Sequence, residues 1–341
     1  MAVWSPSAIA AAGPDTATVA QAEVIDVISD IVPEQLQDRA ADVGGGVTTD
    51  AVGNITYTVD SPVDGDVLTP DFSTQATVSL DPAIGARIVE VGKPEQAITM
   101  QLDSGHETSA GTVVASDAVA FETAGDTKTL VLVKEDASVQ FLTTIPGPQD
   151  PEEFVFNVGL PPGAVAEYAA DGGIRFVNGD GVFLGGVLPP WARDAAGRDL
   201  TTRYQFAGGK LTQFVKHSGV QGVPYPIVAD PWLGKAIWGS TSLSPLSGCA
   251  YQGSTLVCSR YTINLTLTQW GFNSGTLVLN DAGWDEARAK QPRITRYTTS
   301  KDQYNCHALG YFPDREYNWN LEENRSATRD TGLWIRTSCN W

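Results

Sequence analysis

The chain has 341 residues, of which 42% are hydrophobic and 18% charged, and its formal net charge is −18. This length suffices for two or three small domains with buried cores, and the acidic excess excludes nucleic acid as a partner of the whole chain because phosphates would be repelled. The excess lies almost entirely in residues 1–232, whereas residues 233–341 are nearly balanced in charge. No segment is long and apolar enough to predict a transmembrane span.

The N-terminal residues are similar to the end of a secretory signal peptide, with Ala8-Ile9-Ala10 as a small-x-small cleavage site. Residues 16–43 are expected to form a helix, because apolar side chains recur near helical spacing. Pro33 is expected to break or kink this helix, and the glycines at 44–46 to end it. Residues 1–47 are therefore predicted to be a leader remnant followed by a helical segment that packs on the rest of the chain.

Short β-rich runs separated by Gly, Pro and Asp residues follow, at 55–59, 76–80, 86–91, 97–102, 111–115 and 128–133. Such regular spacing predicts an antiparallel, sandwich-like β-rich body. Residues 146–151 are rich in proline, which predicts a boundary loop. Residues 48–150 are therefore expected to form one β-rich domain.

A second group of β-rich runs occupies 154–158, 173–177, 181–184, 202–206 and 211–216. Within it, four segments (Pro190–Gly197, Leu200–Tyr204, Leu211–Val215 and Tyr225–Pro231) resemble a carrier segment of exported proteins from high-GC Gram-positive bacteria. The resemblance covers roughly residues 152–231. It implies a modular layout, in which a β-rich carrier of residues 151–232, ending in Ala229-Asp230-Pro231, precedes a variable C-terminal domain.

All four cysteines lie in the C-terminal domain, residues 233–341. An even count in so short a region favours structural disulfides and an exported, extracellular protein over a zinc site. Gly253-Ser254 suits a two-residue hairpin turn, which places Cys249 opposite Cys258 on a non-hydrogen-bonded pair. Elimination then pairs Cys306 with Cys339.

The C-terminal domain is expected to be a small α+β fold stapled by these disulfides. The strand after the hairpin alternates, with apolar side chains at 257, 261, 263, 265 and 267 on one face. A helix is expected over 282–290, capped by Asn280 or Asp281 and followed by Pro292. We also expect a short helix at 301–309 and two closing strands, at 316–321 and 333–337.

Three motifs occur in order here: Gly283-Trp-Asp-Glu-Ala287, Asp302-Gln-Tyr-Asn-Cys-His307, and Trp319-Asn-Leu-Glu322 with Arg325. They resemble the uncharacterised family called domain of unknown function 2599, which is found at the C-terminal ends of exported proteins from the same bacterial group. The resemblance covers roughly residues 255–341 and implies no activity. The family pattern would place prolines near 321–325, where this chain has Glu323 and then Ser326.

The polar residues of these motifs are candidates for a catalytic site. A histidine beside carboxylates can act as a general acid or base near neutral pH. The candidate catalytic residues are therefore His307, Glu286, Asp302 and Glu322. Arg325 is a candidate for holding a phosphate or carboxylate, and Trp284, Trp319 and Gln303 for substrate contact. This set predicts an effector-like hydrolase acting on an extracellular or cell-wall target, with no cofactor and no metal.

Two alternatives stay open at this point. Each polar residue has a structural interpretation, since Glu286 with Lys290 and Glu322 with Arg325 have the spacing of local ion pairs and His307 adjoins a disulfide. The abundant aromatic residues favour a non-catalytic module that binds glycan or cell wall, although most large rings in so small a domain belong to its core. The expected partners are a cell-wall or glycan target, or a cognate inhibitor protein.

Overall fold

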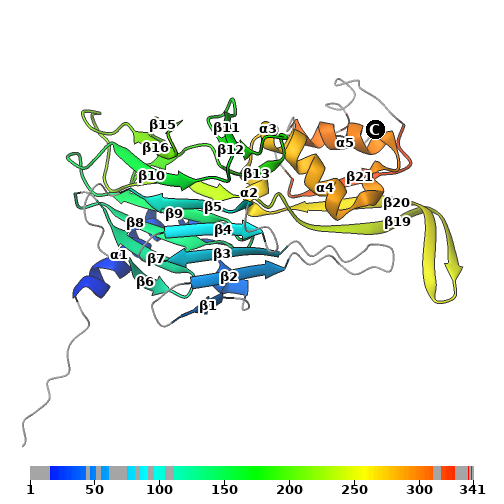
Figure 1. The fold of residues 1–341 in the computed structure, drawn as a ribbon, viewed down its shortest axis with the longest axis horizontal. Helices are drawn as coiled ribbons and strands as arrows, with labels where there is room; N and C mark the ends of the chain where they lie inside the picture. Colours follow the sequence, from blue (N-terminus) through cyan, green and yellow to red (C-terminus); the bar gives the residue numbers. More distant parts are fainter. Residues whose placement is uncertain are drawn as a thin grey trace, which may run out of the picture.

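The computed structural model describes residues 16–43, 47–50, 55–60, 75–81, 85–90, 96–103, 111–123, 125–309, 316–326, 337 and 339. These residues form a mainly β, antiparallel structure with an N-terminal helix, which confirms the predicted fold class (Figure 1). Two large sheets make up the body, here residues 16–234, and the described residues from 235 onward form the C-terminal unit. The predicted signal cleavage site, the glycines at 44–46 and residues 333–336 of the predicted last strand lie outside the described residues.

The first sheet of the body has eight strands. Their order is β1 (Val47–Thr49), β2 (Ile55–Asp60), β3 (Gln75–Asp81), β4 (Gly85–Glu90), β5 (Ile98–Leu102), β10 (Glu153–Gly159), β16 (Lys210–Val215) and β15 (Thr202–Ala207). Along β10, alternate side chains are buried, as expected for a strand with one face on a core. The ring of Phe156 meets that of Phe141 from the second sheet edge to face, with centroids 5.5 Å apart, so the two sheets share one core.

The second sheet has its main strands in the order β11 (Val165–Tyr168), β12 (Ile174–Val177), β13 (Phe183–Val187), β18 (Trp232–Gly234), β9 (Val139–Ile145), β8 (Lys128–Val133), β7 (Ala118–Glu122) and β6 (Thr112–Ala115). Beside this path, β17 (Ile227–Ala229) pairs with β9 and with β14 (Ala192–Arg193). Strands β8 and β9 are buried on both faces; β8 is apolar from Leu130 to Val133, whereas β9 buries Gln140, Thr143 and Thr144 among its apolar residues.

Helix α1 (Thr16–Ile31) covers the outer face of this second sheet. Val24, Ile28 and Val32 recur every four residues and pack with Leu130 and Leu132 of β8. The helix is shorter than the predicted 16–43, because it ends before Pro33 and continues as the 3₁₀ turns η1 (Pro33–Leu36) and η2 (Ala40–Val43). Its predicted role as a packing helix is confirmed.

Strands from both sides of residue 150 pair in both sheets. In the first sheet β5 pairs with β10, and in the second sheet β9 pairs with β17 and β18. Residues 48–150 and 151–232 therefore contribute to the same two sheets and to one shared core.

The C-terminal unit contains a three-stranded sheet with helices on it. Its elements are β19 (Trp238–Gln252), β20 (Thr255–Leu267), α2 (Gln269–Asn273), α3 (Thr276–Val278), the π-helical turn η4 (Leu279–Gly283), α4 (Trp284–Lys290), the 3₁₀ turn η5 (Pro292–Thr295), α5 (Thr298–Ala308) and β21 (Asn318–Glu322). The alternation predicted for β20 is confirmed, since Tyr261, Ile263, Leu265 and Leu267 are all buried.

The helix expected over 282–290 begins earlier than the sequence predicts. Asn280 and Asp281 were expected to cap it, but they lie inside η4, and helical structure already begins at Thr276 after Gly275. The π-helical turn accommodates close packing at Gly283, where a Cβ atom would lie 2.5 Å from the hydroxyl oxygen of Tyr304.

Both predicted disulfides are present. Cys249 lies opposite Cys258 in the β19–β20 hairpin, with Cα atoms 3.8 Å apart, and the turn falls between Gln252 and Thr255 as expected. Cys306 is bonded to Cys339, with Cα atoms 5.7 Å apart, and both are buried. The second bond ties helix α5 to the C-terminal end of the chain.

The C-terminal unit packs directly onto the body. The indole of Trp270 in α2 lies on the backbone of Gly234 in β18, where a Cβ atom would be only 2.4 Å from its Cδ1 atom. Trp232 and Leu188 of the body belong to the same hydrophobic core as Trp270, Ile237 and Trp238. Arg175 of β12 also donates a hydrogen bond of 3.1 Å to Asp281. The two parts are therefore joined by a common core as well as by the chain.

Candidate functional site

Three buried aromatic rings form the centre of the C-terminal unit. Trp238, Tyr304 and Trp319 come from β19, α5 and β21, and their ring centroids lie 4.9 to 6.0 Å apart in edge-to-face contacts. All three side chains are almost fully buried. Trp319, a predicted substrate-binding residue, thus lies in the core, where edge-to-face pairs stabilise the packing.

Glu286 binds the start of β19. Its two carboxylate oxygens accept hydrogen bonds from the backbone N–H groups of Ile237 and Trp238, at 2.9 and 3.2 Å. The Nζ atom of Lys290 lies 2.9 Å from the same carboxylate and also donates to the carbonyl oxygen of Trp238. The expected local ion pair is present, and it holds helix α4 against the first residues of the strand.

His307 lies on the buried side of α5, stacked on Trp319 with ring centroids 5.3 Å apart. Burial lowers the pKa of His307 from 6.5 to about 4, and a hydrogen bond with the backbone of Asn320 opposes this only partly. The imidazole is therefore neutral near pH 7. Within the described residues, no hydrogen bond or ion pair links it to Glu286 or Glu322.

Gln303 and Glu322 join α5 to β21. The side-chain amide of Gln303 donates to the carbonyl oxygen of Glu322 at 3.0 Å and accepts from its backbone N–H at 2.8 Å. The carboxylate of Glu322 pairs with Arg325 at 2.6 Å, and both side chains are about three-quarters buried. This pair is the second expected local ion pair, and it closes the turn that follows β21.

Trp284 and Asp302 lie nearer the surface of α4 and α5. The Nζ atom of Lys301 is 4.3 Å from the centroid of the Trp284 ring and 4.9 Å from that of Tyr304. Burial lowers the pKa of Lys301, and the Asp281 and Asp285 carboxylates oppose that shift. Because the lysine covers a face of the Trp284 ring, that face is not open for stacking on a sugar. Asp302 is half-buried on α5.

Glu323 was singled out in the sequence only as a departure from the family pattern. In the structure it is a buried carboxylate that pairs with Arg293 at 2.8 Å and accepts a hydrogen bond from the backbone N–H of Tyr261. The guanidinium of Arg293 in turn lies 4.4 Å from the centroid of the Tyr261 ring. This ion pair fixes β20 beside the turn after β21.

The carboxyl group of Asp230, in the carrier motif, is also buried, and the sequence did not predict this. It accepts hydrogen bonds from the backbone N–H of Trp191 at 3.1 Å and from the hydroxyl of Tyr204 at 3.2 Å. Burial raises the pKa of Asp230 to about 8, and these hydrogen bonds only partly offset it. The only sequence signal was its place in the Tyr225–Pro231 segment.

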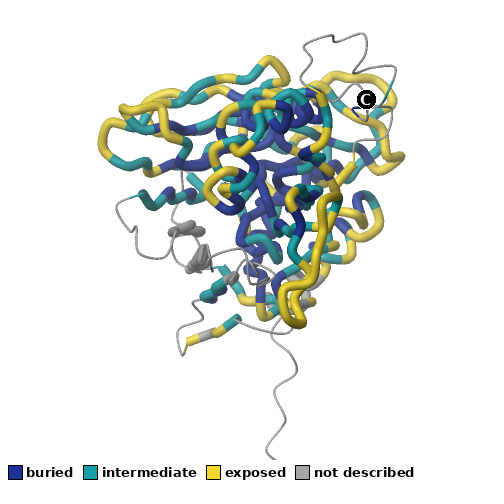
Figure 2. Tube along the Cα trace, turned by 90° about the vertical axis from the view of Figure 1, so that its right-hand side faces the viewer, coloured by how far each residue is buried: buried dark blue, intermediate teal, exposed yellow. Residues whose placement is uncertain are grey.

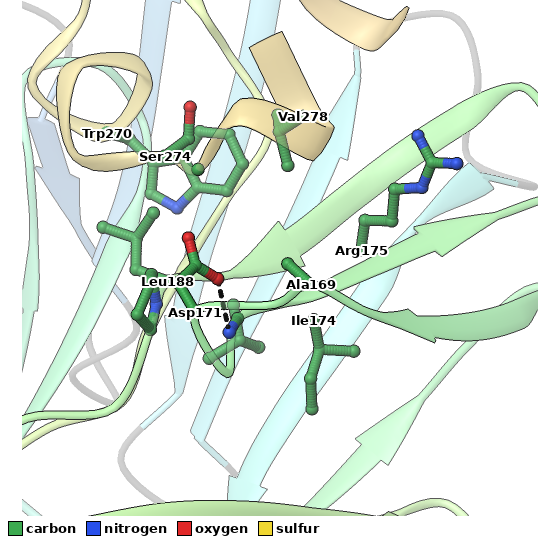
Figure 3. A pocket seen from close by; sticks show the side chains of 12 residues that line it. Ala169, Asp171, Ile174, Arg175, Leu188, Trp270, Ser274 and Val278 are labelled. Carbon is green, nitrogen blue, oxygen red and sulfur yellow. Dashed lines mark hydrogen bonds between the residues drawn. The ribbon is translucent and has the colours of Figure 1, made fainter. Parts of the chain in front are cut away.

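A shallow pocket lies where the C-terminal unit meets the body (Figure 3). Asp171 and Arg175 contribute from the body, and Trp270 and Ser274 from the C-terminal unit. The Asp171 carboxylate accepts a 3.0 Å hydrogen bond from the backbone N–H of Gly173. Its empty volume of about 240 Å³ includes space open to solvent, so the enclosed part is well below the size of about 300–1,000 Å³ that is usual for small-molecule sites.

The distal part of the β19–β20 hairpin is the most exposed regular structure of the C-terminal unit (Figure 2). We call residues 244–259 the arm. Strand β21 pairs with residues 262–266 of β20, so among the described residues the arm beyond them consists of two strands. Tyr251 is 75% exposed and Leu256 is 37% exposed, and the register places them opposite each other near the tip. Residues 236–259 contain no charged side chain.

No family model, curated protein or solved structure matches the chain. None of the helices that the structure describes has the length and apolar character needed to cross a membrane. Across the same described ranges, His, Cys, Asp and Glu side chains do not gather in a group of three or more that could hold a metal ion. The arrangement thus offers a structural network of ion pairs and an exposed arm.

Proposed function

We propose that this chain is a secreted, extracellular protein whose C-terminal unit is a non-catalytic binding module, and that the arm is its contact surface. The observation that carries the proposal is the arm itself, a hairpin closed by the Cys249–Cys258 disulfide with Tyr251 and Leu256 exposed at its tip. A protein in water gains nothing from holding two apolar side chains on a projecting ribbon, whereas a binding partner would bury them.

The disulfide supports this role because it joins the two strands of the arm. A two-stranded ribbon without a third strand is marginally stable in water. The cross-link limits the conformations of the free arm, and a preorganised contact surface loses less entropy when it binds. Two disulfides also favour an oxidising compartment, which supports secretion.

The polar residues of the three motifs support binding over hydrolysis. Glu286 and Glu322 are used in ion pairs and backbone contacts, and His307 has a pKa of about 4, far from the value that suits a general acid or base near neutral pH. The buried Trp238, Trp270 and Trp319 argue against a glycan platform made of tryptophan rings. The resemblance to domain of unknown function 2599 is part of this proposal and names no activity.

The test is binding of the labelled full chain to intact cells of the source organism. A variant with Tyr251→Ser and Leu256→Ser is compared with wild type and with a control carrying Val165→Ser and Val182→Ser. The two control valines are 53% and 52% exposed on the body. We expect the arm variant to lose binding by at least about tenfold, while the control binds like wild type and both keep the wild-type melting temperature. Equal binding by the arm variant contradicts the proposal.

A further inference from the structure

One face of the arm continues as a strip toward the helices. Tyr251 lies opposite Leu256, and Cys249 opposite Cys258, two residues further from the tip. Because every second side chain of a strand points to the same face, these four residues share a face. Arg260, two residues beyond Cys258, shares it as well. The strip therefore passes from an uncharged, apolar tip to a cation at its base.

A second arginine lies beside the first. The guanidinium groups of Arg260 and Arg296 are 5.7 and 5.5 Å from the centroid of the Tyr297 ring. Among the residues that the structure describes, neither of these two guanidinium groups has a carboxylate within ion-pair distance. Arg293 differs, because it is neutralised by the buried Glu323. The strip thus ends in two cations that flank a tyrosine.

The composition of the strip matches the contact surfaces of proteins. Tyrosine and arginine are enriched among the residues that contribute most to protein–protein binding. A membrane is a poorer fit, because β19 is an edge strand and the arm would bring unpaired backbone groups into the lipid. Nucleic acid is also a poor fit, because the chain as a whole carries a net charge of −18.

From this strip we infer that the partner is a protein with an apolar pocket bordered by acidic side chains. The pocket receives Tyr251 and Leu256, and the acidic border meets Arg260 and Arg296. This inference rests on the proposed function, which requires only that the arm binds. The arginines would speed association by electrostatic attraction, which salt screens.

The experiment extends the binding assay to four probes: intact cells, cells treated with protease, purified wall polysaccharide, and phosphatidylglycerol vesicles. The full chain is compared with an Arg260→Glu, Arg296→Glu variant and with Arg296→Glu alone, which changes only an exposed side chain. Arg288→Glu is the matched control, because Arg288 is an exposed arginine that already pairs with Asp285. Each is measured at about 50 mM and about 300 mM salt.

We expect wild type to bind intact cells and to lose at least about tenfold in binding after protease treatment, at the higher salt, and in the double charge variant. The Arg288→Glu control should bind like wild type. Binding that survives protease, or that occurs on polysaccharide or vesicles, overturns the assignment of a protein partner. Charge variants that bind like wild type overturn the acidic border, even if the Tyr251→Ser, Leu256→Ser variant still loses binding. If wild type binds no cells, or if the Tyr251→Ser, Leu256→Ser variant binds like wild type, the proposed function itself fails.

Discussion

The backbone N–H of Trp270 donates a 3.0 Å hydrogen bond to the carboxylate of Asp136, although 134 positions separate the two residues. Trp270 stands in the first turn of α2, and Asp136 lies in the turn between β8 and β9 of the body. Since the Trp270 indole also rests on Gly234, the body supplies part of the environment that the C-terminal unit needs. A carrier that simply released a payload would not share its core in this way.

We therefore expect Trp270→Ala to lower the free energy of unfolding by about 3–5 kcal/mol, the usual cost of removing a buried tryptophan. Its side chain is 1% exposed. Urea denaturation of the full chain would measure the change. Tyr251→Ala is the control, since an exposed aromatic at the arm tip should shift stability by no more than about 0.5 kcal/mol. Similar effects of the two substitutions would contradict the shared core.

Glu286→Gln is expected to destabilise the fold by about 3 kcal/mol, because it leaves the buried ammonium group of Lys290 without its carboxylate. The glutamine can still accept only one of the two backbone hydrogen bonds at Ile237 and Trp238. Asp285→Asn on the same helix breaks an exposed ion pair with Arg288, and its effect should be below about 1 kcal/mol. Thermal melts of the two variants give the comparison.

Local sequence patterns predicted the structural features that depend on residues close together in the chain. The Gly253-Ser254 turn gave the hairpin register and hence the pairing of Cys249 with Cys258. The i,i+4 spacing of Glu286 and Lys290 gave their ion pair. Turn chemistry and helical periodicity act over a few residues, so a single sequence suffices to recognise them.

Contacts between distant segments could not be predicted in the same way. The partner of Arg293 is Glu323, 30 positions away, and nothing local shows that this carboxylate would be buried. Strands β9 and β18 were missed because both are buried sheet strands without simple polar–apolar alternation. The start of the helix at Thr276 was missed because Asn280 and Asp281 are good capping residues that tertiary packing overrides.

The stability of the protein should fall in mild acid because of His307. Burial lowers its pKa to about 4 in the folded chain, whereas an unfolded histidine titrates near 6.5. Between these values the unfolded chain binds a proton that the folded chain does not, so the free energy of unfolding decreases as pH falls from about 6.5 to about 4, by about 3 kcal/mol. In His307→Gln this part of the pH dependence should disappear, whatever its stability at pH 7. An unchanged slope would show that His307 is not buried as a neutral group.

Asp230 should act in the opposite direction. Its pKa is about 8 in the folded chain, above the value of 3.8 for a free side chain. The folded state therefore keeps a proton that the unfolded state releases, and the contribution of Asp230 to stability is lost as pH rises from about 4 to about 8. Asp230→Asn keeps an oxygen that can accept from Trp191 and Tyr204 but does not titrate. We expect the unfolding free energy of the variant, relative to that of wild type, to rise steadily with pH. Urea denaturation from pH 5 to pH 8.5 measures this difference.

The two disulfides should contribute differently. Cys306 and Cys339 are buried and 33 positions apart, so replacing both by serine is expected to cost about 3–4 kcal/mol in unfolding free energy. Cys249 and Cys258 are only 9 positions apart, in an arm that projects from the fold. Without that bond the arm gains freedom in the folded protein too, so the cost to global stability should be below about 2 kcal/mol.

Hydrogen exchange of the arm amides should accelerate, and binding to cells should weaken several-fold, because a loosened arm must be ordered again on contact. Full binding by the reduced arm would mean that the disulfide does not preorganise the contact surface.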